Sequence, residues 1–206
     1  NYRFQKDMLG SLVFPPTLTV LRLDSLIFNY DYLGDNLQYI DVRTSKLIFK
    51  SDFRIPQMAK EFSLNASYLT FESMDFMYHL PTNLASLHLS AKRLGKLYPI
   101  TQMVEWPLKM SEINFKNFNI DYFKLKQLNL NESGLTKIYI SGGDVKKLNA
   151  GLFPVSVKDL SLTEMGIQQL PDSFENLENL QKLDLSGNQL RDIGPVKLPM
   201  ASLQYL

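Results

Sequence analysis

Cysteine is missing from all 206 residues of the sequence, and histidine occurs only twice. The chain therefore has no thiol nucleophile and no thiolate metal ligand. Neither His79 nor His88 has a serine or carboxylate partner at a recognisable spacing, so no catalytic triad is indicated. The phosphate-binding loop G-x-x-x-x-G-K-[ST] does not occur either. We expect no enzyme activity, no metal site, no cofactor and no small-molecule substrate in this chain.

Long hydrophobic runs and an excess of one charge are also missing. The sequence has no apolar stretch of about 18 residues, which argues against a membrane span. Lysine and arginine number 22 against 21 aspartate and glutamate residues, a net charge of +1, so no overall field favours nucleic acid or an anionic membrane. The hydrophobic content of 45% is typical of a globular chain that buries a continuous core.

A leucine pattern dominates the segment Leu177–Leu190, which reads L-E-N-L-Q-K-L-D-L-S-G-N-Q-L. Leu183 and Leu185 alternate with polar residues, as expected for a strand with one buried face. The pattern L-x-x-L-x-L-x-x-N-x-L is completed by Leu180, Leu190 and Asn188. It resembles the leucine-rich repeat family. The resemblance implies that the amide of Asn188 binds the open backbone of neighbouring coils.

The same frame recurs along the chain. We call the apolar residue of each repeat that is equivalent to Leu183 its anchor, and neighbouring anchors are 19 to 26 residues apart. The anchors are Leu21, Ile40, Phe62, Leu87, Ile113, Ile138, Leu160, Leu183 and Leu206. A competing anchor at Leu128 would follow Ile113 after only 15 residues, too few for one repeat. We therefore place a strand at Thr136–Ser141 and Leu125–Leu130 on the return segment.

The resemblance implies an α/β fold, namely a curved leucine-rich-repeat solenoid. Parallel strands would line its concave face, and short helices, 3-10 turns and loops its convex face. We expect residues 1–206 to form a single solenoid of about eight full repeats and a truncated ninth, as a fragment of a longer chain. The leader Asn1–Pro16 resembles the tail of a preceding coil. The repeat asparagine is replaced in earlier coils by Ser45, Ser67, Lys92, Phe118, Gly143 and Met165.

Outward side chains of the strands form the candidate binding surface. Equivalent residues of neighbouring coils lie about 4.8 Å apart in a parallel ladder. The row mixes tyrosine, histidine, arginine and both charge signs, as specific protein interfaces do. We predict that a protein partner contacts the concave face at Arg22, Asp41, Arg43, His88, Asn114, Lys116, Tyr139, Lys158 and Asp184. Trp106, in the long segment before Ile113, either packs beneath its loop or belongs to a second contact surface.

The sequence thus predicts a protein-interaction module, the recognition arm of a larger intracellular protein. Extracellular members of the resembled family commonly close their ends with disulfide-bonded caps, so the lack of cysteine favours a cytoplasmic or nuclear location. Two N-x-S sequons, at Asn65 and Asn131, would be glycosylated only in a secretory protein. Three alternatives stay open: the substrate-recognition segment of an F-box ubiquitin ligase, a regulatory segment of a signalling enzyme, and an extracellular receptor ectodomain. Flanking sequence would separate them.

Overall fold

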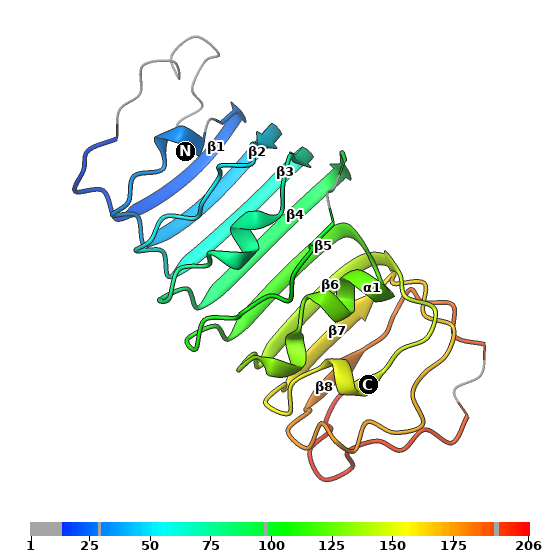
Figure 1. The fold of residues 1–206 in the computed structure, drawn as a ribbon. Coiled ribbons are helices and arrows are strands. Elements are labelled where there is room, and N and C mark those ends of the chain that lie inside the picture. The colour runs from blue at the N-terminus through cyan, green and yellow to red at the C-terminus, as the bar shows by residue number, and fades with distance from the viewer. Residues whose placement is uncertain (1–13, 29, 97–98, 192–193) are drawn as a thin grey trace.

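The computed structural model describes residues 14–28, 30–96, 99–191 and 194–206 (Figure 1). Most of the leader Asn1–Pro16 lies outside these residues. Across the described part of the chain, eight parallel strands form one sheet in chain order. The strands are β1 (Val20–Ile27), β2 (Tyr39–Phe49), β3 (Glu61–Phe71), β4 (Ser86–Leu94), β5 (Glu112–Asp121), β6 (Lys137–Asp144), β7 (Asp159–Thr163) and β8 (Lys182–Asp184). The predicted α/β solenoid is confirmed.

Neighbouring strands pair at the predicted anchors. From Leu21 to Leu183, each anchor is the Cα partner of the next one along the chain. Ile113 lies opposite Ile138, so the placement of a strand around Ile138 is confirmed. An isolated parallel bridge between Lys182 and Tyr205 continues the same frame towards Leu206.

The short helices lie on one side of the sheet and leave the other side open (Figure 1). The α-helix α1 (Tyr122–Gln127) covers the return segment after β5, with Leu125 buried. Asp121 caps this helix, because its Oδ1 atom accepts a hydrogen bond from the Lys124 backbone N–H at 2.8 Å. The 3-10 turns are η2 (Tyr30–Tyr32), η3 (Asp75–Tyr78), η4 (Leu130–Glu132) and η5 (Ala150–Leu152).

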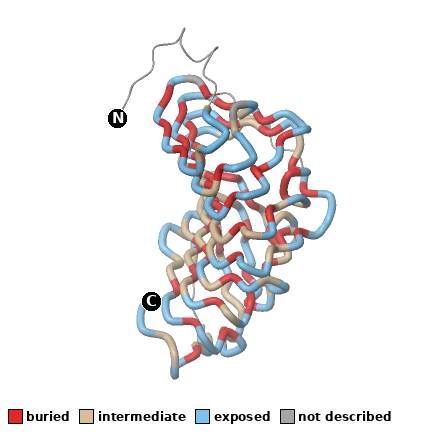
Figure 2. Tube along the Cα trace, turned by 90° about the vertical axis from the view of Figure 1, so that its left-hand side faces the viewer, coloured by how far each residue is buried: buried red, intermediate tan, exposed pale blue. Residues whose placement is uncertain are grey.

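The core runs along the whole sheet, because every coil contributes the same buried positions. Figure 2 shows buried stretches alternating with exposed ones from coil to coil. In the N-terminal coils the core is aromatic. The ring centroid of Phe49 lies 3.9 Å from that of Phe53 and 5.1 Å from that of Phe71, and Phe71 stacks on Phe76 at 5.4 Å. Much of the phenylalanine content therefore fills the interior.

The strands change shape halfway along the solenoid. In β1 to β4 the fourth residue after the anchor is buried and the strand continues through it; these residues are Ser25, Thr44, Ala66 and Ala91. In the later coils the equivalent residue has a positive φ; these residues are Asn117, Gly142, Glu164 and Gly187, with φ of 63°, 78°, 55° and 70°. A residue in the left-handed region of φ and ψ turns the backbone away from the direction of the strand. Strands β7 and β8 are accordingly short.

Asn188 links two coils as the resemblance implied. Its Oδ1 atom accepts hydrogen bonds from the backbone N–H groups of Met165 and Ile167 at 2.9 and 3.1 Å. Its Nδ2 atom donates to the carbonyls of Leu162 and Leu185 at 2.6 and 2.7 Å. Four backbone groups that the strand ladder leaves open thus gain partners.

Gly143 holds the asparagine position two repeats before Asn188, and the structure explains the replacement. A Cβ atom at Gly143 would lie 2.2 Å from the backbone oxygen of Ile120 and 2.8 Å from the Met165 side chain. No side chain fits this approach of two backbones. In the preceding coil Asn117 supplies a related bond instead, from its Nδ2 atom to the Ala91 carbonyl at 2.7 Å.

Candidate protein-binding face

The predicted row of outward side chains forms one continuous ladder across the open side of the sheet. We call this side the ladder face and define it by Arg22, Asp41, Ser63, His88, Asn114, Tyr139, Ser161 and Asp184, each the Cα partner of the next. All of these residues are exposed or half-buried. The strand register therefore aligns six of the nine predicted contact residues.

The remaining three predicted residues lie elsewhere. Arg43 and Lys116 share a second row, in which Asn65 and Ser90 separate them. Lys158 directly precedes β7, and its backbone carbonyl accepts hydrogen bonds from the N–H groups that enter β8. Its exposed side chain lies just before the first residue of β7 and belongs to neither row.

Polar groups in the middle of the ladder face bind one another. The Nζ atom of Lys137 donates to Oε2 of Glu112 at 3.2 Å. The Nε2 atom of His88 lies 3.1 Å from Oε1 of the same carboxylate, without the alignment of a hydrogen bond. Glu112 thus joins β4 to β6 across β5. The Tyr139 hydroxyl donates to Oδ2 of Asp159 at 2.8 Å.

Two residues of the ladder face have shifted pKa values. Burial raises the pKa of Tyr139, and the hydrogen bond to Asp159 and the negative charges of Asp159 and Glu112 act in the same direction. Tyr139 is therefore a neutral donor at physiological pH. Hydrogen bonds from the hydroxyl and backbone N–H of Ser186 lower the pKa of Asp184, which keeps this carboxylate charged.

The N-terminal end of the ladder face differs, because its charges lack partners. Arg22 lies opposite Asp41 in the register, and Asp24 lies opposite Arg43. Among the described residues, no side-chain hydrogen bond and no ion pair within 4.0 Å engages any of these four groups. They form a square of alternating charge that is open to solvent.

A groove lies beside this square. We call it the N-terminal groove; it has a volume of about 470 Å³ and is lined by Asp24, Ser25, Leu26, Arg43, Thr44, Ser45, Asn65, Ser67 and Lys92. Leu26 is 66% exposed. The Oγ1 atom of Thr44 is buried without a hydrogen-bond partner. Of these lining residues, the sequence predicted only Arg43 as a contact residue. Most of the lining comes from the third and fifth residues after each anchor.

Trp106 packs against its own loop. Its indole Nε1–H donates to the backbone carbonyl of Leu128 at 2.7 Å, and the ring is half-buried against the core. This contact ties the segment before β5 to the end of α1. It supports the packing role of the two roles that the sequence left open.

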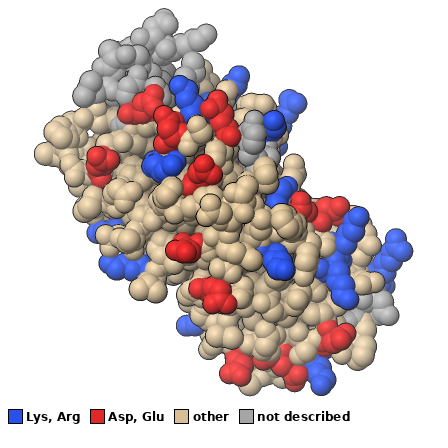
Figure 3. Space-filling model, in the orientation of Figure 1, with Lys and Arg blue, Asp and Glu red and all other residues tan. Residues whose placement is uncertain are grey.

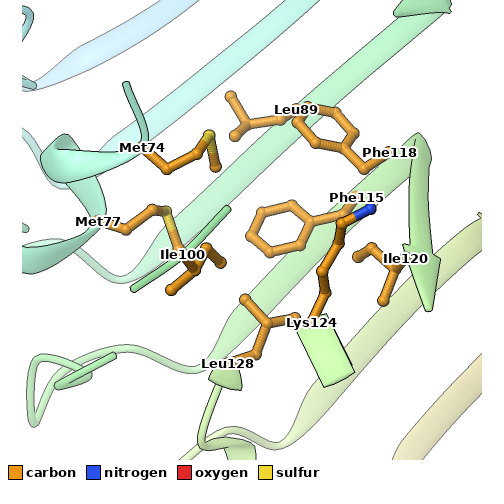
Figure 4. Close-up of a pocket in the computed structure, with 9 residues that line it drawn as sticks. All are labelled: Met74, Met77, Leu89, Ile100, Phe115, Phe118, Ile120, Lys124 and Leu128. Atoms are coloured by element: carbon orange, nitrogen blue, oxygen red, sulfur yellow. The ribbon is translucent and has the colours of Figure 1, made fainter. Parts of the chain in front are cut away.

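A second cavity lies inside the fold (Figure 4). Its volume is only about 20 Å³, and its lining is apolar except for Lys124. The lining comprises Met74, Met77, Leu89, Ile100, Phe115, Phe118, Ile120, Lys124 and Leu128. The Lys124 amine donates to the Asn119 carbonyl at 2.7 Å. A cavity needs roughly 10–15 Å³ by this measure to admit one water molecule, so the void has room for about one water and for no larger ligand.

In the described ranges, no group of three or more histidine, cysteine, aspartate or glutamate side chains is arranged to hold a metal ion. No helix of the described residues is long and apolar enough to cross a membrane.

Comparisons with known proteins give a family match and a distant relative. Residues 133–190 match the family model described as "Leucine rich repeat". This stretch contains β6, β7 and β8 and ends just after Asn188. Over 97% of its length, the chain is 26% identical to the "Disease resistance protein RML1A" of Arabidopsis thaliana. The chain spans 20% of the length of that protein.

Proposed function

We propose, since the chain is a leucine-rich repeat protein, that it binds a protein partner on the ladder face with the N-terminal groove at the centre of the contact. The observation that carries this proposal is the square of unpaired charge formed by Arg22, Asp24, Asp41 and Arg43. Exposed Leu26 lies beside it and offers an apolar anchor. Protein interfaces combine such an anchor with polar groups that fix the orientation of the partner.

The free energy that a partner gains on binding differs between the middle and the N-terminal end of the ladder face. A partner that binds around Glu112 or Tyr139 competes with hydrogen bonds and ion pairs that the fold already makes. A partner at the N-terminal groove breaks no such contact, because the four charges there have none in the described structure. Each new ion pair is then a gain relative to the free protein.

The charge pattern also specifies the kind of partner. Positive and negative groups alternate in both directions across β1 and β2, so a polyanion would meet two carboxylates together with the two arginines. A folded protein surface that carries both signs in the complementary order matches all four groups. Like-charge contacts would exclude other partners and other orientations.

The wider role that we propose is recognition within a larger intracellular protein, by binding and without catalysis. The lack of cysteine supports an intracellular location, and the related disease resistance protein is about five times longer than the matched segment. We further propose that residues 1–206 act as one solenoid of about eight full repeats and a partial ninth, because one register runs through all the strands.

The test is a pull-down from intact cells with bound proteins identified by mass spectrometry. The groove variant carries Arg22→Ala, Asp24→Ala, Asp41→Ala and Arg43→Ala, which leaves the net charge unchanged. The control variant carries Lys126→Ala and Glu178→Ala, two exposed residues of opposite charge that lie outside the groove and outside the predicted contact residues, so its net charge is also unchanged. We expect the groove variant to lose a discrete partner that the wild type and the control retain, with equal thermal unfolding of all three by circular dichroism. An identical partner list for the groove variant and the wild type would refute the proposal.

A further inference from the structure

The loop side of the C-terminal coils carries a second groove. Two cavities of about 610 and 460 Å³ share Lys147, Leu170, Pro171 and Asp172 and so form one continuous depression. We call it the lysine groove. Its remaining lining residues are Tyr122, Val145, Lys146, Leu148 and Asn149 at one end, and Gln169, Gly194, Pro195, Val196 and Lys197 at the other.

Backbone hydrogen bonds between coils hold the walls of the lysine groove in place. Gln169 N–H donates to the Lys146 carbonyl and Leu148 N–H to the Gln169 carbonyl, both at 3.0 Å. Lys197 N–H donates to the Asp172 carbonyl at 3.0 Å. Isolated parallel bridges join Lys147 to Gln169 and Ser173 to Lys197. The groove is therefore preformed, which lowers the entropic cost of binding.

Lysines dominate the charge of the groove. Lys146, Lys147 and Lys197 are all exposed, and Asp172 is the carboxylate among the lining residues. In Figure 3, lysine and arginine side chains gather at the right-hand edge of the molecule, on the side where the loops after β6 lie in Figure 1. The three lysines give the groove a positive potential.

The lysines are available to a ligand. Nζ of Lys146 lies 3.8 Å from Oδ2 of Asp144, but both side chains are 67% exposed, so this ion pair is weak. Neither Lys147 nor Lys197 makes a side-chain hydrogen bond or ion pair with another described residue. An incoming carboxylate would thus meet amines that have no competing partner.

The floor of the groove is apolar. Leu170 and Val196 are half-buried and pack against the core, and Pro171 lies between the two cavities. The ligand therefore needs an apolar group between its charges. Among the described lining residues Tyr122 is the one aromatic ring. Stacking platforms for single-stranded nucleic acid use successive aromatic rings, so the lining favours a peptide.

We propose that the lysine groove binds an extended acidic peptide segment whose aspartate or glutamate side chains flank an apolar residue. The carboxylates pair with Lys147 and Lys197, and the apolar side chain covers Leu170 and Val196. This site is lined by residues that follow the strands and shares none of its lining residues with the ladder face. It would be a second interaction surface, and this proposal does not depend on the one made for the N-terminal groove.

Fluorescence anisotropy of the purified protein tests the proposal with a short fluorescein-labelled peptide in which glutamate alternates with leucine. A peptide with lysine in place of glutamate is the ligand control, and an unlabelled single-stranded oligonucleotide is the competitor. The test variant is Lys147→Glu with Lys197→Glu. The matched control variant is Lys50→Glu with Lys126→Glu, which makes the same change of charge at exposed sites outside the groove and outside the predicted contact residues.

The acidic peptide is expected to bind the wild type and the control variant with equal affinity, and the test variant about tenfold or more weakly. Binding should weaken as salt rises, because the contacts are exposed ion pairs. Unfolding curves by circular dichroism should coincide for all three proteins. Three results would each overturn the proposal: no saturable binding of the acidic peptide, equal loss of affinity in both variants, or displacement by the oligonucleotide at lower concentration than by unlabelled peptide.

Discussion

Tyr139 on β6 donates its hydroxyl proton to Oδ2 of Asp159 on β7 at 2.8 Å. The other carboxylate oxygen of Asp159 is buried without a hydrogen-bond partner among the described atoms. The tyrosine is therefore a structural donor as well as a member of the ladder face. Removing its hydroxyl deprives a half-buried carboxylate of a charge-assisted hydrogen bond.

We expect Tyr139→Phe to lower the free energy of unfolding by about 1–2 kcal/mol at neutral pH. The raised pKa of Tyr139 sets the pH dependence. In the unfolded chain the hydroxyl ionises near pH 10, whereas the folded protein retains the proton, so the stabilisation is present below about pH 10 and declines above it. Urea unfolding at a series of alkaline pH values should show the two proteins converging. Equal stability at neutral pH would contradict the assigned hydrogen bond.

Asn188→Ala should destabilise the protein by about 2–4 kcal/mol, because four backbone groups of neighbouring coils lose their partner. The matched control is Asn65→Ala, at an exposed strand position whose amide makes no side-chain hydrogen bond with a described residue. Amide hydrogen exchange should show faster exchange in β7 and β8 for the first variant only. Similar exchange in both variants would argue against the bridging role of Asn188.

Leu89→Asp and the adjacent Ser90→Asp test the alternation of the strand frame. Leu89 is 1% exposed, so an aspartate there would be buried unpaired and should cost more than about 3 kcal/mol. Ser90 faces the open side beside Asn65 and Lys116, and the same substitution should change stability by less than about 1 kcal/mol. Thermal unfolding by circular dichroism decides the question. A reversed order of stability would mean that Ser90, and not Leu89, faces the core.

Gly143→Ala should cost about 1–3 kcal/mol, because the new Cβ atom meets the Ile120 backbone oxygen at 2.2 Å and the strands must separate. Gly34→Ala is the control, since a Cβ atom at Gly34 has no other atom within 4 Å. The control should be neutral or more stable by a few tenths of a kcal/mol, through a less flexible unfolded chain. Denaturant titration of both variants measures the difference. A neutral Gly143→Ala would mean that the two backbones have room to separate.

The strand frame was predictable because each coil repeats the same alternation under the same constraint. Every strand must pair with its neighbour, so the anchors cannot drift even though the return segments vary in length. This constraint also resolved the choice between Leu128 and Ile138 in favour of the residue that keeps a full repeat from Ile113. The role of Asn188 followed from its place in the same pattern.

The free and the engaged side chains of the ladder face could not be told apart from the sequence. His88, Tyr139 and Asp184 look equivalent to Arg22 in the pattern, yet the first three have polar partners within the fold. Those partners come from neighbouring coils some 20 or more residues away or from the turn after the strand. Side-chain reach across strands therefore decides which residues remain available.

By itself the sequence determined the architecture of this protein: one parallel strand per repeat, the buried anchors and the row of outward residues. Local periodicity suffices for these features, because backbone pairing repeats with every coil. Only the tertiary structure showed the features on which the two proposed binding surfaces rest. The square of unpaired charge beside Leu26 and the lysine groove at Lys147 and Lys197 both arise where residues from successive coils come side by side. The number of residues between equivalent positions of successive coils varies with the length of each return segment. No fixed sequence spacing therefore identifies these two surfaces.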